Sequence, residues 1–246
     1  MKAQESTDPG IRINKYIADA GVCSRRSADA LIVSGRVRIN DHPAGTGERV
    51  NPGDRVFVDE KEIRPVEEKV YLLLNKPAGI TCTADRNDPS NVIDHLHYPL
   101  RITYCGRLDK DSEGLLLLTN DGDIINQMMK ASNFHEKEYV VTVDRKVTPG
   151  FLRQLEKGVW LEELDTTTRP CRAWAQEDPY TFRIVLTQGL NRQIRRMCEA
   201  IGFHVRRLKR VRIMNLKIGN LKSGEMRPVS EKELKKLKEL LVGSHK

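Results

Sequence analysis

Residues 106–118 read Gly-Arg-Leu-Asp-Lys-Asp-Ser-Glu-Gly-Leu-Leu-Leu-Leu. The stretch begins as a dense polar cluster and ends in the continuous apolar run 115–118. A short run of this kind predicts a strand that is buried on both faces. Because such a strand fixes the loop that leads into it, the loop is a suitable place for a catalytic carboxylate. A purely structural loop explains the same residues equally well.

The segments around this stretch predict an α+β domain. Residues 70–74 form a second continuous apolar strand, which the polar sequence 75–79 is expected to stop, and further strands are expected at 139–143 and 182–186. Helices are expected near 124–130 and 151–156, after Gly189, and after a capping box formed by Ser230 and Glu233. The two element types do not alternate regularly, which favours a mixed, largely antiparallel sheet.

The first 60 residues predict a separate, smaller module. A helix beginning at Ile13 ends at Gly21, and Ser24 is placed to cap a second helix over 25–34, before short strands at 37–39 and 56–58. We therefore expect a loose N-terminus over 1–10, a small domain over 11–60, a charged linker over 61–69 and the larger domain over 70–246.

The positive charge is concentrated at the end of the chain. The chain of 246 residues has a formal net charge of +8. Residues 1–60 are neutral and residues 61–190 have a net charge of −3, whereas residues 191–246 carry +11. Between Arg192 and Arg212 there are eight basic residues and one acidic residue, Glu199. A solvated basic helix and strand would explain this cluster, but an RNA or DNA surface is the favoured interpretation.

Several classes of protein and site are disfavoured. The chain shows no apolar run long enough to cross a membrane and no export signal. Its five cysteines are widely separated, so reduced thiols in the cytoplasm are expected. Asp109, Asp111 and Glu113 resemble the first half of a calcium loop, but leucines fill the later ligand positions. We expect neither a metal nor a cofactor.

Four segments together resemble the pseudouridine synthases of the RsuA/RluB/RluF group. They are Leu-Asn-Lys-Pro-Ala-Gly (74–79), the stretch 106–122, His-Glu-Lys-Glu-Tyr (135–139) and Gln-Gly-Leu-Asn-Arg-Gln-Ile-Arg-Arg-Met-Cys-Glu (188–199). Residues 11–59 are similar to an S4 RNA-binding domain, so the likeness covers about nine-tenths of the chain. The form of the motifs is most similar to the RluF branch, which acts on a uridine of 23S ribosomal RNA near the peptidyl-transferase centre.

The resemblance implies an RNA isomerase that needs no cofactor. A uridine is detached from its ribose, turned, and rejoined through C5. The catalytic carboxylate would be Asp109, acting on C1′ as a nucleophile or on the 2′ proton as a base. Arg195 would pair with Asp109 and favour its ionised form. Tyr139 would stack on the target base, and Arg107 would fill the gap that the flipped base leaves. Lys76 and Pro77 would shape the wall of the site.

The remaining basic residues would hold RNA by its shape and phosphates rather than by base edges. In the S4 domain these are Arg25, Arg26, Arg36 and Arg38, and beside the active site they are Arg192 and Arg196. The expected partner is 23S ribosomal RNA or a pre-ribosomal particle, and the protein is expected to be a monomer. Alternatives are another ribosomal site, a tRNA stem-loop as substrate, or a non-catalytic RNA-binding protein that assists ribosome assembly.

Overall fold

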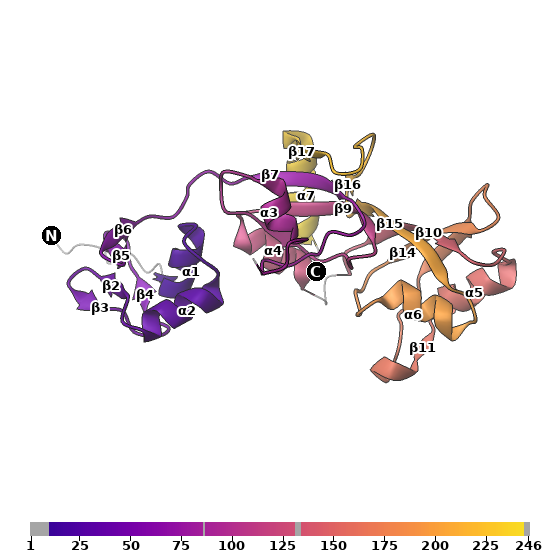
Figure 1. The fold of residues 1–246 in the computed structure, drawn as a ribbon, viewed down its shortest axis with the longest axis horizontal. Helices are drawn as coiled ribbons and strands as arrows, with labels where there is room; N and C mark the ends of the chain where they lie inside the picture. Colours follow the sequence, from indigo (N-terminus) through magenta and orange to yellow (C-terminus); the bar gives the residue numbers. More distant parts are fainter. Residues whose placement is uncertain (1–9, 86, 131–133, 244–246) are drawn as a thin grey trace. The chain divides into compact units, whose positions relative to one another are not determined.

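The computed structural model describes residues 10–85, 87–130 and 134–243 (Figure 1). By its contacts the chain divides into two compact units. The N-terminal unit comprises the residues up to Lys69 with Pro99–Arg101 and Asn120–Gly122, and the C-terminal unit comprises the rest. The N-terminus expected over 1–10 lies outside the described residues except for Gly10.

The N-terminal unit packs two helices against short strands. Helices α1 (Ile13–Asp19) and α2 (Arg25–Val33) precede a sheet in the order β3 (His42–Pro43), β2 (Val37–Ile39), β5 (Val56–Val58), β6 (Lys61–Ile63). A separate pair joins β1 (Ile11–Arg12) to β4 (Arg49–Val50). The hydroxyl of Ser24 accepts a hydrogen bond from the amide of Ser27, so the expected cap of α2 is present. The apolar faces of both helices and of β2 and β5 form one core.

One boundary in this unit differs from the expectation. Residues 61–63, expected to begin the linker, form β6 and pair with β5. Charged residues dominate this segment and hide its strand pattern, but Ile63 lies opposite Val56 and packs against the core of the unit. The strand therefore extends three residues into the segment that was expected to be a linker.

The C-terminal unit is built on a nine-stranded sheet. Its main path runs β13 (Arg172–Ala175), β14 (Thr181–Leu186), β10 (Lys137–Val143), β15 (Val205–Ile213), β9 (Glu113–Thr119), β7 (Tyr71–Lys76), β17 (Met226–Pro228). Strand β16 (Leu216–Lys217) pairs with β15, and β8 (Thr103–Cys105) pairs with β9. Among the named strands of the described chain only β9 and β15 pair in parallel, so the expectation of a largely antiparallel α+β fold is confirmed.

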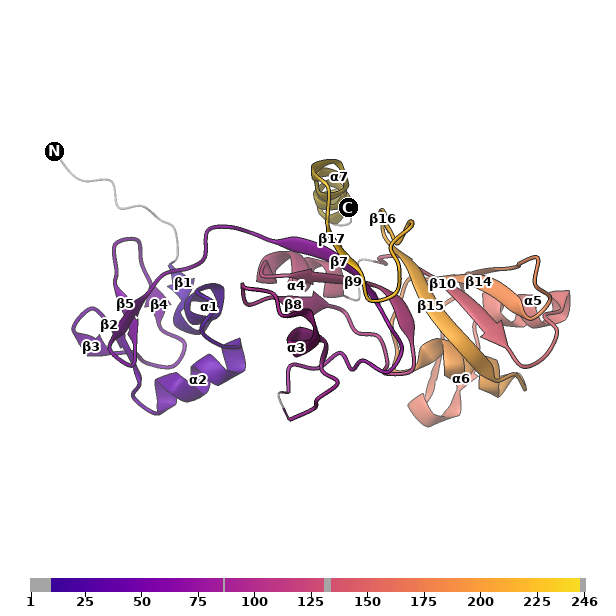
Figure 2. The ribbon, with the colours of Figure 1, turned by 45° about the horizontal axis from the view of Figure 1, so that its top comes forward.

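Helices cover this sheet in two groups (Figure 2). Helices α5 (Pro149–Lys157) and α6 (Gln193–Ala200) pack with β10 and β14 in one apolar cluster. Two short strands, β11 (Trp160–Leu161) and β12 (Thr166–Thr167), pair beside this cluster and are joined by a 3₁₀ turn (Glu162–Leu164). Helices α4 (Gly122–Met129) and α7 (Glu231–Gly243) pack on β7 and β9 in a second cluster. Figure 2 shows α3 (Val92–Leu96) on the opposite side of β7 and β9 from α7.

The strand that was expected over 70–74 continues further than predicted. It runs through Asn75 and Lys76, both of which are buried. Polar residues do not stop this strand because their side chains find partners. Asn75 donates to the carbonyl of Leu221, and the amine of Lys76 donates to the carbonyls of Pro77 and Ile80, at 2.8 Å each.

Candidate active site

Strand register places four residues in one row across the middle of the large sheet. Lys76 of β7 lies opposite Gly114 of β9, Gly114 lies opposite Arg210 of β15, and Arg210 lies opposite Tyr139 of β10. Residues in register point to the same face of a sheet, so the side chains of Lys76, Arg210 and Tyr139 share one face. The loop 106–112 enters the sheet at this row, directly before β9.

The backbone around Asp109 is held by three hydrogen bonds. The amide of Gly79 donates to the carbonyl of Lys110 at 2.7 Å, and the amide of Ser112 donates to the carbonyl of Asp109 at 3.0 Å. The amide of Leu108 donates to the sulfur of Cys82 at 3.4 Å. The Asp109 side chain nevertheless remains 34% exposed. A carboxylate with a fixed backbone and an accessible head group can meet a substrate without a large rearrangement.

Arg192 is the arginine that reaches Asp109. Its Nη1 lies 3.8 Å from Oδ2 of Asp109 and 3.4 Å from Oδ1 of Asp111. Arg192 directly precedes α6 and has a left-handed backbone, with φ of 49°. Such a conformation is costly for a residue other than glycine, and residues held in it cluster at functional sites. The sequence instead predicts that Arg192 binds RNA phosphates.

Arg195 occupies a different position from the one expected. The predicted ion pair with Asp109 is absent: Nη2 of Arg195 instead lies 3.1 Å from Oδ2 of Asp111 and donates to the Asp111 carbonyl at 3.3 Å. Its Nη1 donates to the carbonyl of Val205 at 3.3 Å. The side chain is 13% exposed, so it is held between α6, the loop and the start of β15.

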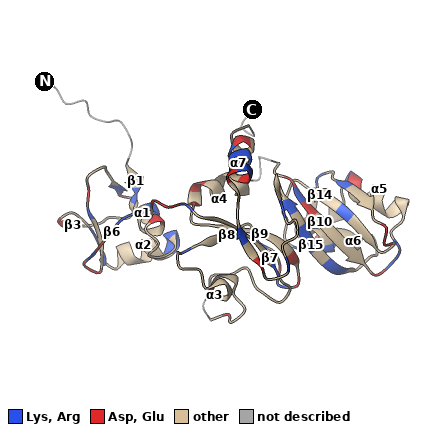
Figure 3. Ribbon diagram, turned by 90° about the horizontal axis from the view of Figure 1, so that it is seen from above, with Lys and Arg blue, Asp and Glu red and all other residues tan. Residues whose placement is uncertain are grey.

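The other arginines near the loop differ in how they are paired. Arg196 forms an ion pair with Glu163 and donates to the carbonyl of Asn191. It was expected to bind RNA phosphates, but here its guanidinium is already paired. Arg107 is exposed, and no described residue pairs with its guanidinium. Figure 3 shows further Lys and Arg residues along β15.

Tyr139 and Lys76 lie at the two ends of the central row. Tyr139 is half-buried and packs against the apolar cluster of α5 and α6. Lys76 is completely buried, and burial lowers the pKa of its amine, while the carboxylates of Asp111 and Asp109 act in the opposite direction. A buried amine that binds two carbonyls shapes the backbone at 77–80, which is where Gly79 contacts the loop.

The four arginines of the N-terminal unit that are expected to bind RNA fall into two pairs. Arg36 forms a bidentate pair with Asp59, and Arg38 pairs with Glu60 while its guanidinium lies 4.1 Å from the centre of the Phe57 ring. Arg25 donates only to the amide oxygen of Asn14, at 3.4 Å, and Arg26 is exposed without a partner in the described chain. Arg25 and Arg26 are therefore the more available pair for RNA phosphates.

The sequence assigns no role in this site to two of its residues, Asp111 and Arg210. Asp111 belongs to the motif, and its spacing of two from Asp109 is a signal that could have identified it. Arg210 is one of eight basic residues between Arg192 and Arg212, and nothing in the sequence separates it from the others. Only the structure distinguishes it, because it is 2% exposed whereas Arg206 and Arg207 on the same strand are exposed.

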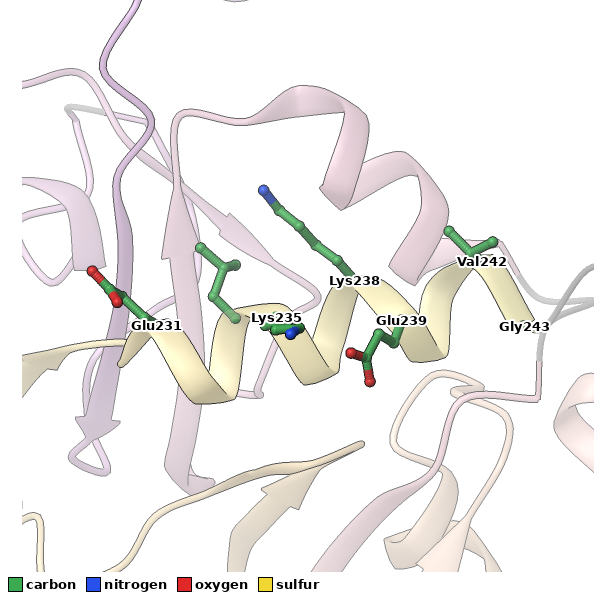
Figure 4. Close-up of a pocket in the computed structure, with 7 residues that line it drawn as sticks. Glu231, Lys235, Lys238, Glu239, Val242 and Gly243 are labelled. Atoms are coloured by element: carbon green, nitrogen blue, oxygen red, sulfur yellow. The ribbon is translucent and has the colours of Figure 1, made fainter.

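Other kinds of site find little support in the residues that the structure describes. No group of three or more His, Cys, Asp or Glu residues is arranged to hold a metal. No described helix is long and apolar enough to cross a membrane. A surface groove lies along α7 and is lined by Glu231, Leu234, Lys235, Lys238, Glu239, Val242 and Gly243 (Figure 4). It shares no residue with the loop 106–112, so it is not the site described above.

Comparisons with known proteins agree on one family for the larger part of the chain. Residues 70–200 match RNA pseudouridylate synthase, and residues 11–56 match the S4 domain. The chain is 45% identical over 239 residues to the dual-specificity RNA pseudouridine synthase RluF of Escherichia coli K12, covering 96% of this chain and 81% of that protein. It is 37% identical to the ribosomal large subunit pseudouridine synthase B of Bacillus subtilis, covering 93% of this chain and 96% of that protein.

A solved structure shares the fold. A crystal structure of a pseudouridylate synthase matches with a TM-score of 0.68 and 29% identity, and the match covers 93% of this chain and all of that one. Because the match covers 93% of this chain, it extends over residues of both units.

Proposed function

Because this chain belongs to the RNA pseudouridylate synthase family, we propose that it isomerises a specific uridine of 23S ribosomal RNA near the peptidyl-transferase centre, with Asp109 as the catalytic carboxylate. The observation that carries the assignment of Asp109 is its place in the fold. It is a partly exposed carboxylate on a loop anchored to the central sheet, with the guanidinium of Arg192 at 3.8 Å.

The residues divide the reaction between them. Asp109 starts it as an ionised carboxylate, either attacking C1′ or removing the 2′ proton, and in both routes the bond between C1′ and N1 breaks. The uracil turns and a bond forms between C1′ and C5. In the nucleophilic route this step breaks the ester bond between C1′ and Asp109, and in the other route the proton returns to C2′. The C5 proton is then lost and N1 gains a proton, so atoms balance without a cofactor. Tyr139 supports the detached uracil from the neighbouring part of the sheet.

Arg107 supports the flipped state of the target nucleotide. A base that leaves its stack exposes a gap, and filling the gap lowers the cost of flipping. Arg107 precedes Asp109 by two residues and is exposed. No described residue pairs with its guanidinium, so it can move into the RNA without breaking an ion pair. Arg25 and Arg26 of the S4 domain contribute phosphate contacts at a second place on the RNA.

The choice of RNA rests on the relatives, several of which are named dual-specificity enzymes. We infer that ribosomal RNA is the main substrate and that a stem-loop of a second RNA, such as a tRNA, is accepted as well. We also propose that the enzyme acts as a monomer in the cytoplasm, because one chain carries both the RNA-binding and the catalytic domains. Sedimentation equilibrium of the free protein tests the monomer.

Mapping pseudouridines in the RNA of a deletion strain tests the assignment of substrate. The strain is complemented with the wild-type chain or with Asp109→Asn. We expect one 23S site near the peptidyl-transferase centre, and one tRNA site, to lose pseudouridine and to regain it only with the wild-type chain. Loss confined to 16S RNA, or to a distant 23S site, would contradict the proposed target while leaving the activity in place.

A further inference from the structure

Arg210 lies in the middle of the central sheet and is 2% exposed. It is among the largest completely buried side chains of the described protein. Arginine is almost never fully buried unless it is paired. No described carboxylate forms an ion pair with Arg210, so its charge is balanced in another way. This burial without an ion pair requires an explanation.

The guanidinium of Arg210 binds the backbone both before and after Asp109 in the sequence. Its Nε donates to the carbonyl of Leu115 at 2.7 Å, and its Nη1 donates to the carbonyl of Arg107 at 3.3 Å. Arg107 lies two residues before Asp109, and Leu115 lies six residues after it. One side chain therefore ties the start of the loop to the strand that follows it. Its third nitrogen, Nη2, is buried without a hydrogen-bond partner.

A close approach between two strands allows this contact. A Cβ atom on Gly114 would lie 2.2 Å from the carbonyl oxygen of Arg210, so only glycine fits there. Gly114 has φ of 109°, which also favours glycine. Because β9 and β15 meet at this point, the side chain of Arg210 reaches the carbonyl of the next residue, Leu115.

Arg212, two residues along the same strand, shows that an arginine of β15 can have a different role. A register irregularity between Glu138 and Tyr139 places Arg210 opposite Tyr139 and Arg212 opposite Glu138. The two arginines consequently lie on different faces of the sheet. Arg212 pairs with Glu138 at 2.8 Å and Glu136 at 3.0 Å, away from the loop 106–112. It is therefore a matched control.

We propose that Arg210 is a positioning residue for the isomerisation. Its guanidinium holds Asp109 in place through its hydrogen bonds to the carbonyls of Arg107 and Leu115. The proposal rests on the assignment of Asp109 as the catalytic carboxylate. Arginine suits this role better than lysine because its planar group directs donors to two separate carbonyls. A lysine at this position would keep the charge but would lack the Nε donor that binds the carbonyl of Leu115.

The test uses the full-length chain with the variants Arg210→Lys, Arg210→Met and Arg212→Met. Single-turnover rates at saturating enzyme report on chemistry, and filter binding reports on affinity, both with ribosomal RNA from the deletion strain. We expect Arg210→Met to lower the rate about 100-fold and Arg210→Lys about 10-fold, as small misplacements of a reacting group do. RNA affinity should change less than about 3-fold, since Arg210 is not at the surface.

Hydrogen exchange supplies a readout that a general loss of stability does not produce. The amides of Leu108 and Ser112 should exchange faster in Arg210→Lys but not in Arg212→Met. Arg212→Met should lower the melting temperature and leave the rate of the folded enzyme within about 3-fold of wild type. If Arg210→Met fails to fold, Arg210→Lys decides alone.

Three results would overturn the role of Arg210: a wild-type rate in Arg210→Lys, equal rate losses in Arg210→Met and Arg212→Met at equal folded fraction, or a loss confined to RNA affinity. The Asp109→Asn variant separates this proposal from the proposed function. Activity in Asp109→Asn contradicts the function itself. An inactive Asp109→Asn beside an active Arg210→Met contradicts only the positioning role.

Discussion

Arg195 binds Asp111 rather than Asp109: its Nη2 lies 3.1 Å from Oδ2 of Asp111 and also donates to the Asp111 carbonyl. Through this contact α6 is attached to the loop that carries the proposed catalytic carboxylate. Arg192 shares Asp111 and lies between it and Asp109. Asp111 therefore arranges two arginines around its neighbour, and its removal has a predictable effect.

Asp111→Asn keeps the shape of the side chain and removes the charge. The Asp111 side chain is 49% exposed, so solvent screens its ion pairs and the free energy of unfolding should fall by about 1 kcal/mol or less. The isomerisation rate should fall about 10-fold, because Arg192 and Arg195 both lose the carboxylate with which they pair. Urea unfolding and tritium release from C5-labelled RNA measure the two effects. The control is Glu163→Gln, which unpairs Arg196 on the same helix; if it slows the reaction as much as Asp111→Asn, the loop contact is not the cause.

Gly114→Ala should destabilise the sheet at its centre. The added methyl group would lie 2.2 Å from the Arg210 carbonyl oxygen, and φ of 109° is unfavourable for alanine. We expect a loss of about 3 kcal/mol or more in the free energy of unfolding. Gly122→Ala is the matched control, since no atom lies within 4 Å of its added methyl group and its φ is not positive. Equal denaturation midpoints for the two variants would contradict the close approach of β9 and β15.

The two kinds of arginine in the S4 domain should differ in how they bind RNA. Arg26→Ala removes an exposed charge without a described partner, whereas Arg36→Ala removes one that is neutralised by Asp59. The slope of log affinity against log salt should become less steep by about 0.7 to 1 in Arg26→Ala and by clearly less in Arg36→Ala. Titrations at several salt concentrations measure this. A larger change in Arg36→Ala would show that its ion pair opens on RNA.

The capping box of α7 should contribute to stability in a pH-dependent way. The bidentate contact with Arg227 and bonds from Ser230 lower the pKa of Glu233 to about 2. A lowered folded-state pKa contributes stability that is complete above the unfolded value of about 4.5 and is lost as pH falls toward 2. Glu233→Gln should therefore cost about 1–2 kcal/mol at pH 7 and progressively less below pH 4.5. A pH-independent difference between the two proteins would contradict this account.

The sequence predicts the elements of this fold better than the contacts between them. The runs 70–74 and 115–118, the cap at Ser24 and the capping box of Ser230 and Glu233 each rest on local chemistry, and all are present. The family and the α+β sheet follow from ordered motifs. The misplaced ends depend on strand pairing, which the local pattern does not show: Lys76 continues β7 by pairing with Gly114 of β9, and Ile63 lies in a strand that pairs with β5.

The site could be predicted only in part because its geometry depends on register. Which arginine meets which carboxylate is set by how α6 docks on the loop, and spacing alone does not separate Asp109 from Asp111. The burial of Arg210 depends on a bulge in β10 and β15 and on the absence of a side chain at Gly114. A charge count in contrast places all eight basic residues between Arg192 and Arg212 in one class.

The central claim is that Asp109 performs the isomerisation. Tritium release from RNA labelled at C5 of uridine follows the lost proton directly, and it is compared between the wild-type chain and Asp109→Asn with the enzyme in excess over RNA. We expect release from one uridine per RNA with the wild-type chain, and none above background with Asp109→Asn at unchanged RNA affinity and melting temperature. Release by Asp109→Asn at the wild-type rate would contradict the account.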